Sequence, residues 1–300
     1  MISRFKAELF LILATVVWGG TFPVISELLS FISAAQIVGF RFLISSLILL
    51  PFLFKGGLFF RVRQGVVDGL ILGFLTFSGF YLQTFGLNFT TPARSAFITQ
   101  LLLIYVLIFQ IFAKRKQPTI WNFISTFILL IGAVILVDPF TLKGQLNKGD
   151  IITGLSAAAF AAYIIRIDHV KSEGRMISIL FSQFVICSVL GFALAFAQDT
   201  TPPTFNLTSI SLILYLAIPA TLFATYTMLK YQPKTTPMRA SILYSLEPIF
   251  ATLITILFLG IWPLKHEIIG GSIVFFAVIL SEISPLLHFQ FLRNRRSAKS

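Results

Sequence analysis

The stretch Thr90-Thr91-Pro92-Ala93-Arg94-Ser95 recurs 145 residues later, with two changes, as Thr235-Thr236-Pro237-Met238-Arg239-Ala240. A second match, the tetrapeptide Ala-Val-Ile-Leu at 133–136 and 277–280, lies at nearly the same offset. Two matches at one spacing indicate a duplicated unit. The repeated stretch is short and polar, and an apolar segment follows each copy. The sequence therefore predicts two halves built on the same plan.

The apolar segments are long enough to cross a bilayer. The chain is 57% hydrophobic and 11% charged, whereas a soluble domain carries about 25% charged residues. A span needs roughly 20 mostly apolar residues, and its backbone must be helical in lipid. Ten segments meet this requirement: 9–29, 34–54, 67–87, 93–113, 119–137, 149–167, 176–197, 209–229, 238–259 and 266–287. We predict an all-α, polytopic membrane protein with ten transmembrane helices.

Charge sets the orientation. With the N-terminus inside, eighteen of the 23 Lys and Arg residues fall in cytoplasmic segments and three in outer loops. This distribution follows the positive-inside rule and predicts cytoplasmic N- and C-termini. The net charge of +12 is then explained by topology, so we do not expect nucleic acid as a partner.

The repeated positions lie five spans apart. Because five is odd, the two halves must have opposite orientations in the membrane. We expect a first five-helix repeat at 1–138, an outer connecting loop at 139–148, a second repeat at 149–288 and a basic cytoplasmic tail at 289–300. Inverted repeats are typical of secondary transporters, in which one half rocks against the other.

The sequence offers little for other chemistry. One cysteine and three histidines make neither a metal cluster nor a catalytic constellation, so we expect no enzyme, no metal and no cofactor. No Gly-x-x-x-x-Gly-Lys motif is present to bind ATP. The alternative that stays open is a membrane-embedded enzyme or lipid-handling protein without transport activity.

Several motifs in order carry a family resemblance. They are Trp18-Gly19-Gly20-Thr21-Phe22, Arg41-Phe42-Leu43, Pro237-Met238-Arg239-Ala240-Ser241, Leu246-Glu247-Pro248-Ile249-Phe250-Ala251 and Ile269-Gly270-Gly271. With these the chain resembles the drug/metabolite transporter superfamily, specifically the EamA-type permeases. The resemblance implies two inverted five-helix repeats around a central cavity, in a multi-pass protein of the bacterial inner membrane. It also implies a permease for amino-acid-like or amphipathic metabolites, often working in efflux.

The chain departs from the family pattern at the ends of two helices. EamA-type repeats commonly end the fourth and ninth helices with Leu-Gly-Glu, but here these helices end Phe112-Ala113-Lys114 and Leu259-Gly260-Ile261. The first repeat also has Leu102-Leu103 where the second has Glu247-Pro248. Coupling through those family acids is therefore not carried over to this chain.

Glu247 is the first candidate for a binding or coupling residue. It lies two to three turns into the ninth predicted span, where a carboxylate costs several kcal/mol unless it is paired, hydrated or protonated. Pro248 removes a backbone donor beside it and favours a kink. The functional interpretation is a group that binds a proton or a substrate amine. The alternative is a structural carboxylate hydrogen-bonded to a neighbouring helix.

Arg41 has two interpretations as well. It lies near the outer end of the second predicted span and can attract an anionic group of the substrate. We favour the alternative, in which the side chain snorkels to the outer headgroups or pairs with Glu27. Arg94, at the outer start of the fourth span, is expected to be interfacial.

Glycine and proline predict interruptions in three spans. Gly19, Gly20 and Pro23 lie in the first, Pro219 in the eighth and Pro248 in the ninth. Each removes a backbone hydrogen bond or permits local unwinding, so these residues are candidate hinges. Close helix packing explains the glycines equally well.

Polar aromatic side chains are candidates for the cavity wall, because hydroxyl and indole groups in hydrocarbon need partners. We expect them to face the bundle interior, and they are Trp18, Tyr81, Tyr105, Tyr163, Tyr226 and Tyr244. The sequence thus predicts a secondary carrier of small organic metabolites, an exporter that works by alternating access. Its substrate, its coupling to protons and its oligomeric state stay open.

Overall fold

The computed structural model describes residues 4–54, 59–113, 118–137, 147–198, 201–259 and 262–280 apart from 263 and 267. These residues form helices and no strands. The first group of helices is α1 (Arg4–Gly19), α2 (Thr21–Leu28), α3 (Ala34–Phe54), α4 (Phe59–Gly86), α5 (Pro92–Thr99), α6 (Leu102–Ala113) and α7 (Ile120–Val137). The second is α8 (Lys148–His169), α9 (Met176–Ala197), α10 (Leu207–Ala217), the π-helix η1 (Ile218–Phe223), α11 (Ala224–Tyr231), the short 3₁₀ helix η2 (Gln232–Lys234), α12 (Pro237–Tyr244) and α13 (Glu247–Leu259).

The helices have the length and composition of membrane spans. Within the described residues, seven helical segments are long and apolar enough to cross a bilayer, and Ile120–Ile135 and Ile268–Leu280 are shorter apolar helices. The predicted ninth span is divided into α12 and α13, and the end of the predicted tenth, 281–287, lies outside the described residues. The prediction of an all-α polytopic membrane protein is confirmed at this level.

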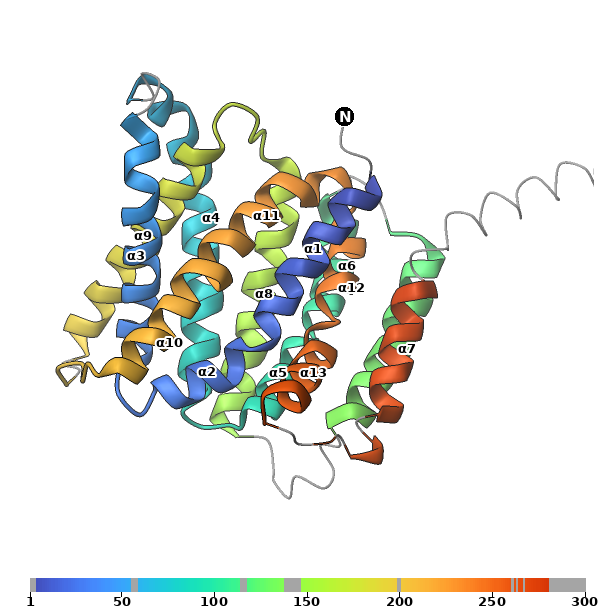
Figure 1. The fold of residues 1–300 in the computed structure, drawn as a ribbon. Coiled ribbons are helices and arrows are strands. Elements are labelled where there is room, and N and C mark those ends of the chain that lie inside the picture. Colours follow the sequence, from blue (N-terminus) through green and yellow to red (C-terminus); the bar gives the residue numbers. More distant parts are fainter. Residues whose placement is uncertain are drawn as a thin grey trace, which may run out of the picture.

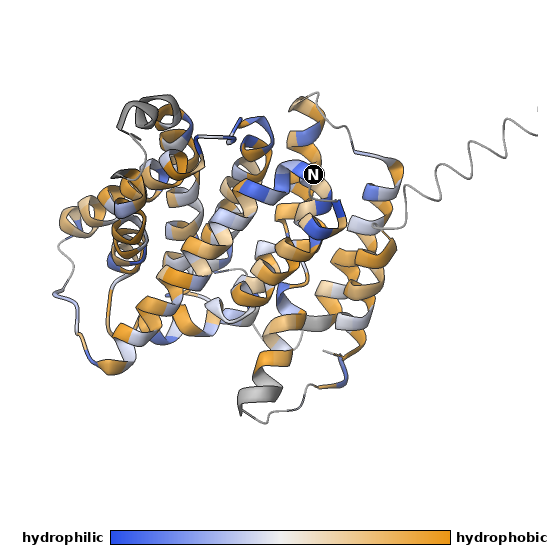
Figure 2. Ribbon diagram, turned by 45° about the horizontal axis from the view of Figure 1, so that its top comes forward, coloured by the Kyte–Doolittle hydropathy of each residue, from blue (hydrophilic) through white to orange (hydrophobic). Residues whose placement is uncertain are grey.

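Hydrophobic residues run along the helices, and hydrophilic ones gather at helix ends and in connecting loops (Figure 2). Large apolar side chains such as Phe74, Phe127 and Phe196 are 60%, 67% and 87% exposed. Such exposure suits contact with lipid, whose tails are as apolar as these side chains. The bilayer therefore serves as the solvent for the outside of the bundle.

Small residues bring α4 and α9 close together. A Cβ added to Gly69 would lie 2.7 Å from the Ile179 carbonyl oxygen, and one at Gly73 would lie 2.9 Å from the Gln183 carbonyl oxygen. Between α3 and α9, a Cβ at Gly191 would lie 2.6 Å from the backbone nitrogen of Gly39. Helices in lipid associate through such close approaches, since no hydrophobic force drives them together.

The duplicated stretch forms the same local structure twice. Thr91 caps α5 and Thr236 caps α12, each accepting a hydrogen bond from the backbone N–H three residues later, with proline at the next position. Proline suits the first turn of a helix, where its missing donor costs nothing. The first helix then stops at residues 100–101 and the second at 245–246. These interruptions are 145 residues apart, as are the caps.

Two further interruptions follow the predicted glycine and proline positions. The first span breaks at Gly20, between α1 and α2, and the eighth contains the π-helix η1 around Pro219. Pro23 lies in the first turn of α2 and Pro248 in the first turn of α13, so both follow a break without kinking a continuous helix.

The two ranges predicted to be repeats, 1–138 and 149–288, begin at opposite ends of the bundle. In Figure 1, α1 starts at the end marked N, and α8 starts at the far end. We refer to these as the N-terminal end and the opposite end. The first helix of each range packs against helices of the other range. α8 contacts α4, α5 and α6, and α1 contacts α11, α12 and α13.

Candidate functional site: a cavity among interrupted helices

Three helix interruptions meet at one cavity. Trp18 and Thr21 flank the break at Gly20, Thr99 and Leu102 flank the break at 100–101, and Tyr244 and Glu247 flank the break at 245–246; all six side chains line the cavity. Side chains of α4, α8 and α11 complete its wall. Interrupted helices expose backbone groups and end dipoles, which is how transporters build binding sites in mid-membrane.

The cavity is small. A water-sized molecule can occupy about 80 Å³ of it, and one water needs roughly 10–15 Å³ on this measure. A few waters fit, whereas pockets for organic ligands are several times larger. The cavity is therefore narrow in this conformation.

Glu247 contributes a carboxylate to this cavity. Within the described part of the chain, no residue donates a hydrogen bond to it or pairs with it, although it interacts electrostatically with Tyr215. The alternative interpretation requires a hydrogen-bond partner on a neighbouring helix, and the described residues provide none. An unpaired carboxylate in a mid-membrane cavity is costly and is free to bind a ligand or a proton.

Trp18 is held rigidly in the wall. Its indole Nε1 donates a 2.9 Å hydrogen bond to the Ala220 carbonyl oxygen in η1, and its ring packs edge-on against Tyr244 with centroids 5.4 Å apart. A π-helix leaves carbonyl groups outside the regular helix ladder, and Ala220 offers one here. The eighth span is thereby fixed to the first.

The predicted tyrosines divide into two groups. Tyr163 and Tyr244 line the cavity, and their hydroxyls are held by glutamine side chains, at 3.0 Å from Gln183 Nε2 and 3.1 Å from Gln232 Oε1.

The other three tyrosines lie away from the cavity. The Tyr81 hydroxyl accepts a hydrogen bond from Gln198 and that of Tyr226 accepts one from Lys230, while Tyr105 stacks on Phe109. The sequence did not predict four further polar side chains that line the cavity beside Tyr163 and Tyr244: Thr21, Thr76, Thr99 and Thr225. The feature of the sequence that could have identified them is a polar residue inside an otherwise apolar segment.

The favoured interpretation of Arg41 is wrong. The side chain is fully buried, and its Nε donates a 2.8 Å hydrogen bond to Thr221 Oγ1 in η1. It reaches neither a headgroup region nor Glu27, whose side chain is exposed on α2. The π-helix presents Thr221 toward α3, and this inward partner was invisible in the sequence.

The two glycines of the first span pack closely at its break. A Cβ on Gly19 would lie 2.9 Å from the backbone nitrogen of Ala251, and one on Gly20 would lie 2.6 Å from the Tyr215 hydroxyl. Both interpretations of this pair therefore describe the structure: the helix is interrupted, and its glycines admit a neighbouring helix. Movement at Gly19, Gly20, Pro23, Pro219 and Pro248 stays a prediction.

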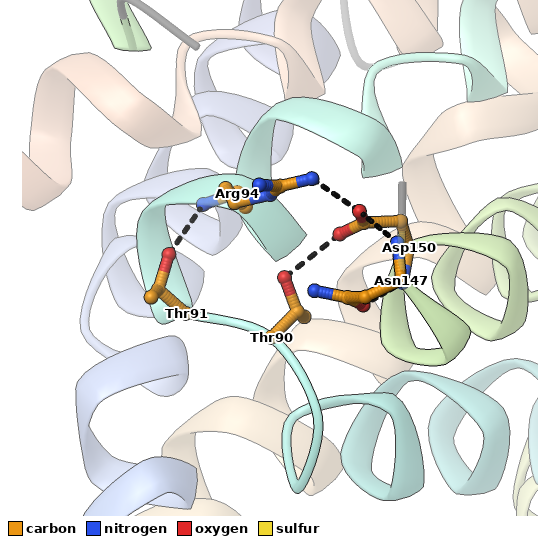
Figure 3. A network of polar contacts seen from close by, with 5 residues as sticks. All are labelled: Thr90, Thr91, Arg94, Asn147 and Asp150. Carbon is orange, nitrogen blue, oxygen red and sulfur yellow. Dashed lines mark hydrogen bonds and ion pairs between the residues drawn. The ribbon is translucent and has the colours of Figure 1, made fainter. Parts of the chain in front are cut away.

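An ion pair joins α5 to α8 at the opposite end of the bundle (Figure 3). Arg94 on α5 pairs with Asp150 on α8, and Thr90 Oγ1 donates a 2.8 Å hydrogen bond to the same carboxylate. Asp150 also accepts the backbone N–H of Asn147 in a capping box. The Arg94 side chain is 14% exposed, and its position at the membrane interface stays a prediction.

The second copy of the duplicated stretch makes the matching contact at the N-terminal end. Arg239 on α12 lies 3.6 Å from Glu8 on α1, and Thr235 Oγ1 lies 3.4 Å from the same carboxylate oxygen. Arg4 also pairs with Glu8, at 2.7 Å. Thr90 and Arg94 thus have counterparts in Thr235 and Arg239. The first pair contacts Asp150 near the start of α8, and the second contacts Glu8 near the start of α1.

Comparison with known proteins gives the family. The sequence profile of the EamA-like transporter family matches residues 5–138 and 147–283. The chain belongs to this family. Like other EamA-like transporters it is a multi-pass protein of the inner membrane, with small molecules as substrates.

Individual relatives agree with that assignment. An uncharacterized transporter of Archaeoglobus fulgidus is 30% identical over 93% of this chain and 86% of its own length. An S-adenosylmethionine uptake transporter of Rickettsia felis is 26% identical over 62% of this chain and 65% of its own length. A solved crystal structure matches with a TM-score of 0.78 over 93% of this chain and 97% of its own, at 15% identity, and shows the fold alone.

Proposed function

We propose that this EamA-like transporter is a secondary carrier of small organic metabolites that works by alternating access. Its working parts are two inverted five-helix repeats, 1–138 and 149–288, with both termini in the cytoplasm. The two separate profile matches and the helix breaks 145 residues apart support the repeats. The basic residues of the predicted cytoplasmic segments support the orientation.

The observation that carries the proposal is the pair of matching contacts at the two ends of the bundle. The Arg94–Asp150 and Arg239–Glu8 contacts lie on opposite sides of the cavity, and each joins one half to the other. Releasing one while keeping the other opens the cavity toward one side only. A carrier needs this alternation, because a path open at both ends would be a channel.

Glu247 is the proposed binding or coupling group for the cargo. Its unpaired carboxylate suits a cationic group of the cargo or a proton that travels with the cycle. S-adenosylmethionine, the cargo named for the Rickettsia relatives, carries such a cation. Trp18, Tyr163 and Tyr244 then shape the apolar part of the cavity wall. Besides proton coupling, the transport cycle can run by exchange of one substrate for another or by facilitated diffusion.

The named relatives favour uptake over the export that the family resemblance suggested. The Rickettsia proteins are named as S-adenosylmethionine uptake transporters. The cycle of an alternating-access carrier is reversible, so the gradient of cargo and coupling ion decides the direction. We therefore propose uptake of a metabolite with a cationic group.

Mass spectrometry of both compartments tests this function. Cells producing the protein are compared with cells producing none, in medium supplemented with S-adenosylmethionine and a mixture of amino-acid derivatives. We expect at least one compound to move from medium to cytosol, chemically unchanged, only when the protein is present. Enrichment in the medium would instead establish export. A compound or lipid that is chemically altered but not moved would contradict the carrier and support the membrane-embedded enzyme or lipid-handling alternative.

A further inference from the structure

The side chain of Arg41 on α3 lies wholly inside the protein. It is 0% exposed, and only its Nε has a hydrogen bond, to Thr221 Oγ1. Its two terminal nitrogens, Nη1 and Nη2, have no partner among the residues that the structure describes. A guanidinium keeps its proton under physiological conditions, so the positive charge remains in the interior.

No described residue near Arg41 supplies an anion to neutralise this charge. The titratable groups that interact with it electrostatically are the Cys187 thiol and the Tyr215 phenol, and neither is an anion at neutral pH. The rings of Phe80 and Phe42 lie 4.2 and 5.5 Å from its central carbon. Cation–π contacts are weaker than the hydration that a buried cation loses. An intramembrane cation kept at this cost indicates a function that uses it.

Phe80 lies against Arg41 and also belongs to the cavity wall. Its ring centroid is 4.2 Å from the central carbon of the guanidinium, and Phe80 and Glu247 both line the cavity. The π-helix fixes both sides of this arrangement, because Ala220 accepts the Trp18 indole N–H and its neighbour Thr221 accepts the Arg41 Nε–H. Turning the Phe80 ring aside would place the two free nitrogens at the cavity wall.

We propose that Arg41 is the oxyanion-binding group of the transport cavity and takes a carboxylate of the cargo when Phe80 turns aside. This rests on the proposed function, in which the cavity holds the cargo. The paired terminal nitrogens of a guanidinium match the two oxygens of a carboxylate in one plane. The cargo then carries an anionic group as well as the cationic group that Glu247 receives. In this conformation the Phe80 ring covers the guanidinium.

The test measures the melting temperature of the purified full-length protein against sodium acetate and sodium phosphate at constant ionic strength. An anion that binds only the folded state raises the melting temperature saturably. We expect acetate to do so for the wild type. Phe80→Ala removes the covering ring and should lower the half-saturating acetate concentration. Arg41→Gln should abolish the acetate response, and Lys265→Gln, which removes an exposed cation, should leave it unchanged.

Phe80→Ala should strengthen the acetate response and Arg41→Gln should abolish it, so the two variants decide the outcome. An equal acetate response in Arg41→Gln, or none in both the wild type and Phe80→Ala, would overturn the proposal. A response to phosphate alone would overturn the assignment to a carboxylate. If Arg41→Gln does not fold, the comparison of Phe80→Ala with the wild type still decides. Because no transport is measured, failure here is distinct from failure of the proposed function.

Discussion

Replacing Glu247 by glutamine should reduce transport about 10- to 100-fold while the protein still folds and reaches the membrane. The carboxylate is the unpaired acid of the cavity wall, and a hydrogen bond to a charged group is worth about 1.5–3 kcal/mol. Glutamine keeps the shape but loses the charge and the ability to bind a proton. The measurement is the initial rate of transport of the compound identified by mass spectrometry, at equal membrane abundance.

Glu27→Gln is the matched control for this variant. Glu27 is exposed on α2, so the same chemical change there should leave the rate at the wild-type level. Full activity of Glu247→Gln would remove Glu247 from the mechanism while keeping the carrier. Equal losses in both variants would indicate a general effect of charge removal.

Removing the two arginines of the end contacts should shift the protein in opposite directions. Arg94→Gln breaks the contact with Asp150 and favours opening at the opposite end, whereas Arg239→Gln weakens the contact with Glu8 and favours opening at the N-terminal end. Each contact is a partly buried charge-assisted interaction, so losing it should change the population ratio about tenfold. The Arg94 variant should shift more, since Arg94 donates a hydrogen bond to Asp150, whereas Arg239 Nε lies 3.6 Å from Glu8.

The population ratio is measured as the rate of thiol labelling from the outer face divided by that from the cytoplasmic face. The labelled residue is a cysteine placed in the cavity. Lys148→Gln, which removes an exposed cation near Asp150, should leave the ratio unchanged. If both arginine variants shifted it in the same direction, the two contacts would not act as opposed closures.

Much of the fold could be predicted from the sequence because the bilayer imposes a length on each apolar segment. The predicted segments 34–54 and 176–197 coincide with α3 and α9, and the duplicated stretch anticipated matching helix starts. The sequence did not show that this stretch also forms the ion pairs. Asp150 and Glu8 come from the first span of the other half, a relation that only the packed bundle reveals.

The cavity wall was harder to predict. A span that is apolar all round has no amphipathic stripe, so the sequence does not show which face points inward. Tyr163 and Tyr81 therefore look alike in sequence, although only Tyr163 lines the cavity. The prediction for Arg41 was wrong for a related reason. Its hydrogen-bond partner Thr221 lies in a π-helix, and the changed register of that helix cannot be derived from composition.

The central claim is that one cavity opens alternately to the two sides of the membrane. Thr225 lines the cavity and is 4% exposed, and Cys187 is the single cysteine of the chain. The decisive measurement is labelling of Thr225→Cys, in a Cys187→Ala background, with a membrane-impermeant thiol reagent applied to intact cells and to inverted vesicles. The account predicts labelling from both faces, with the ratio moved in opposite directions by Arg94→Gln and Arg239→Gln. Labelling from one face only, in the parent and in both variants, would contradict it.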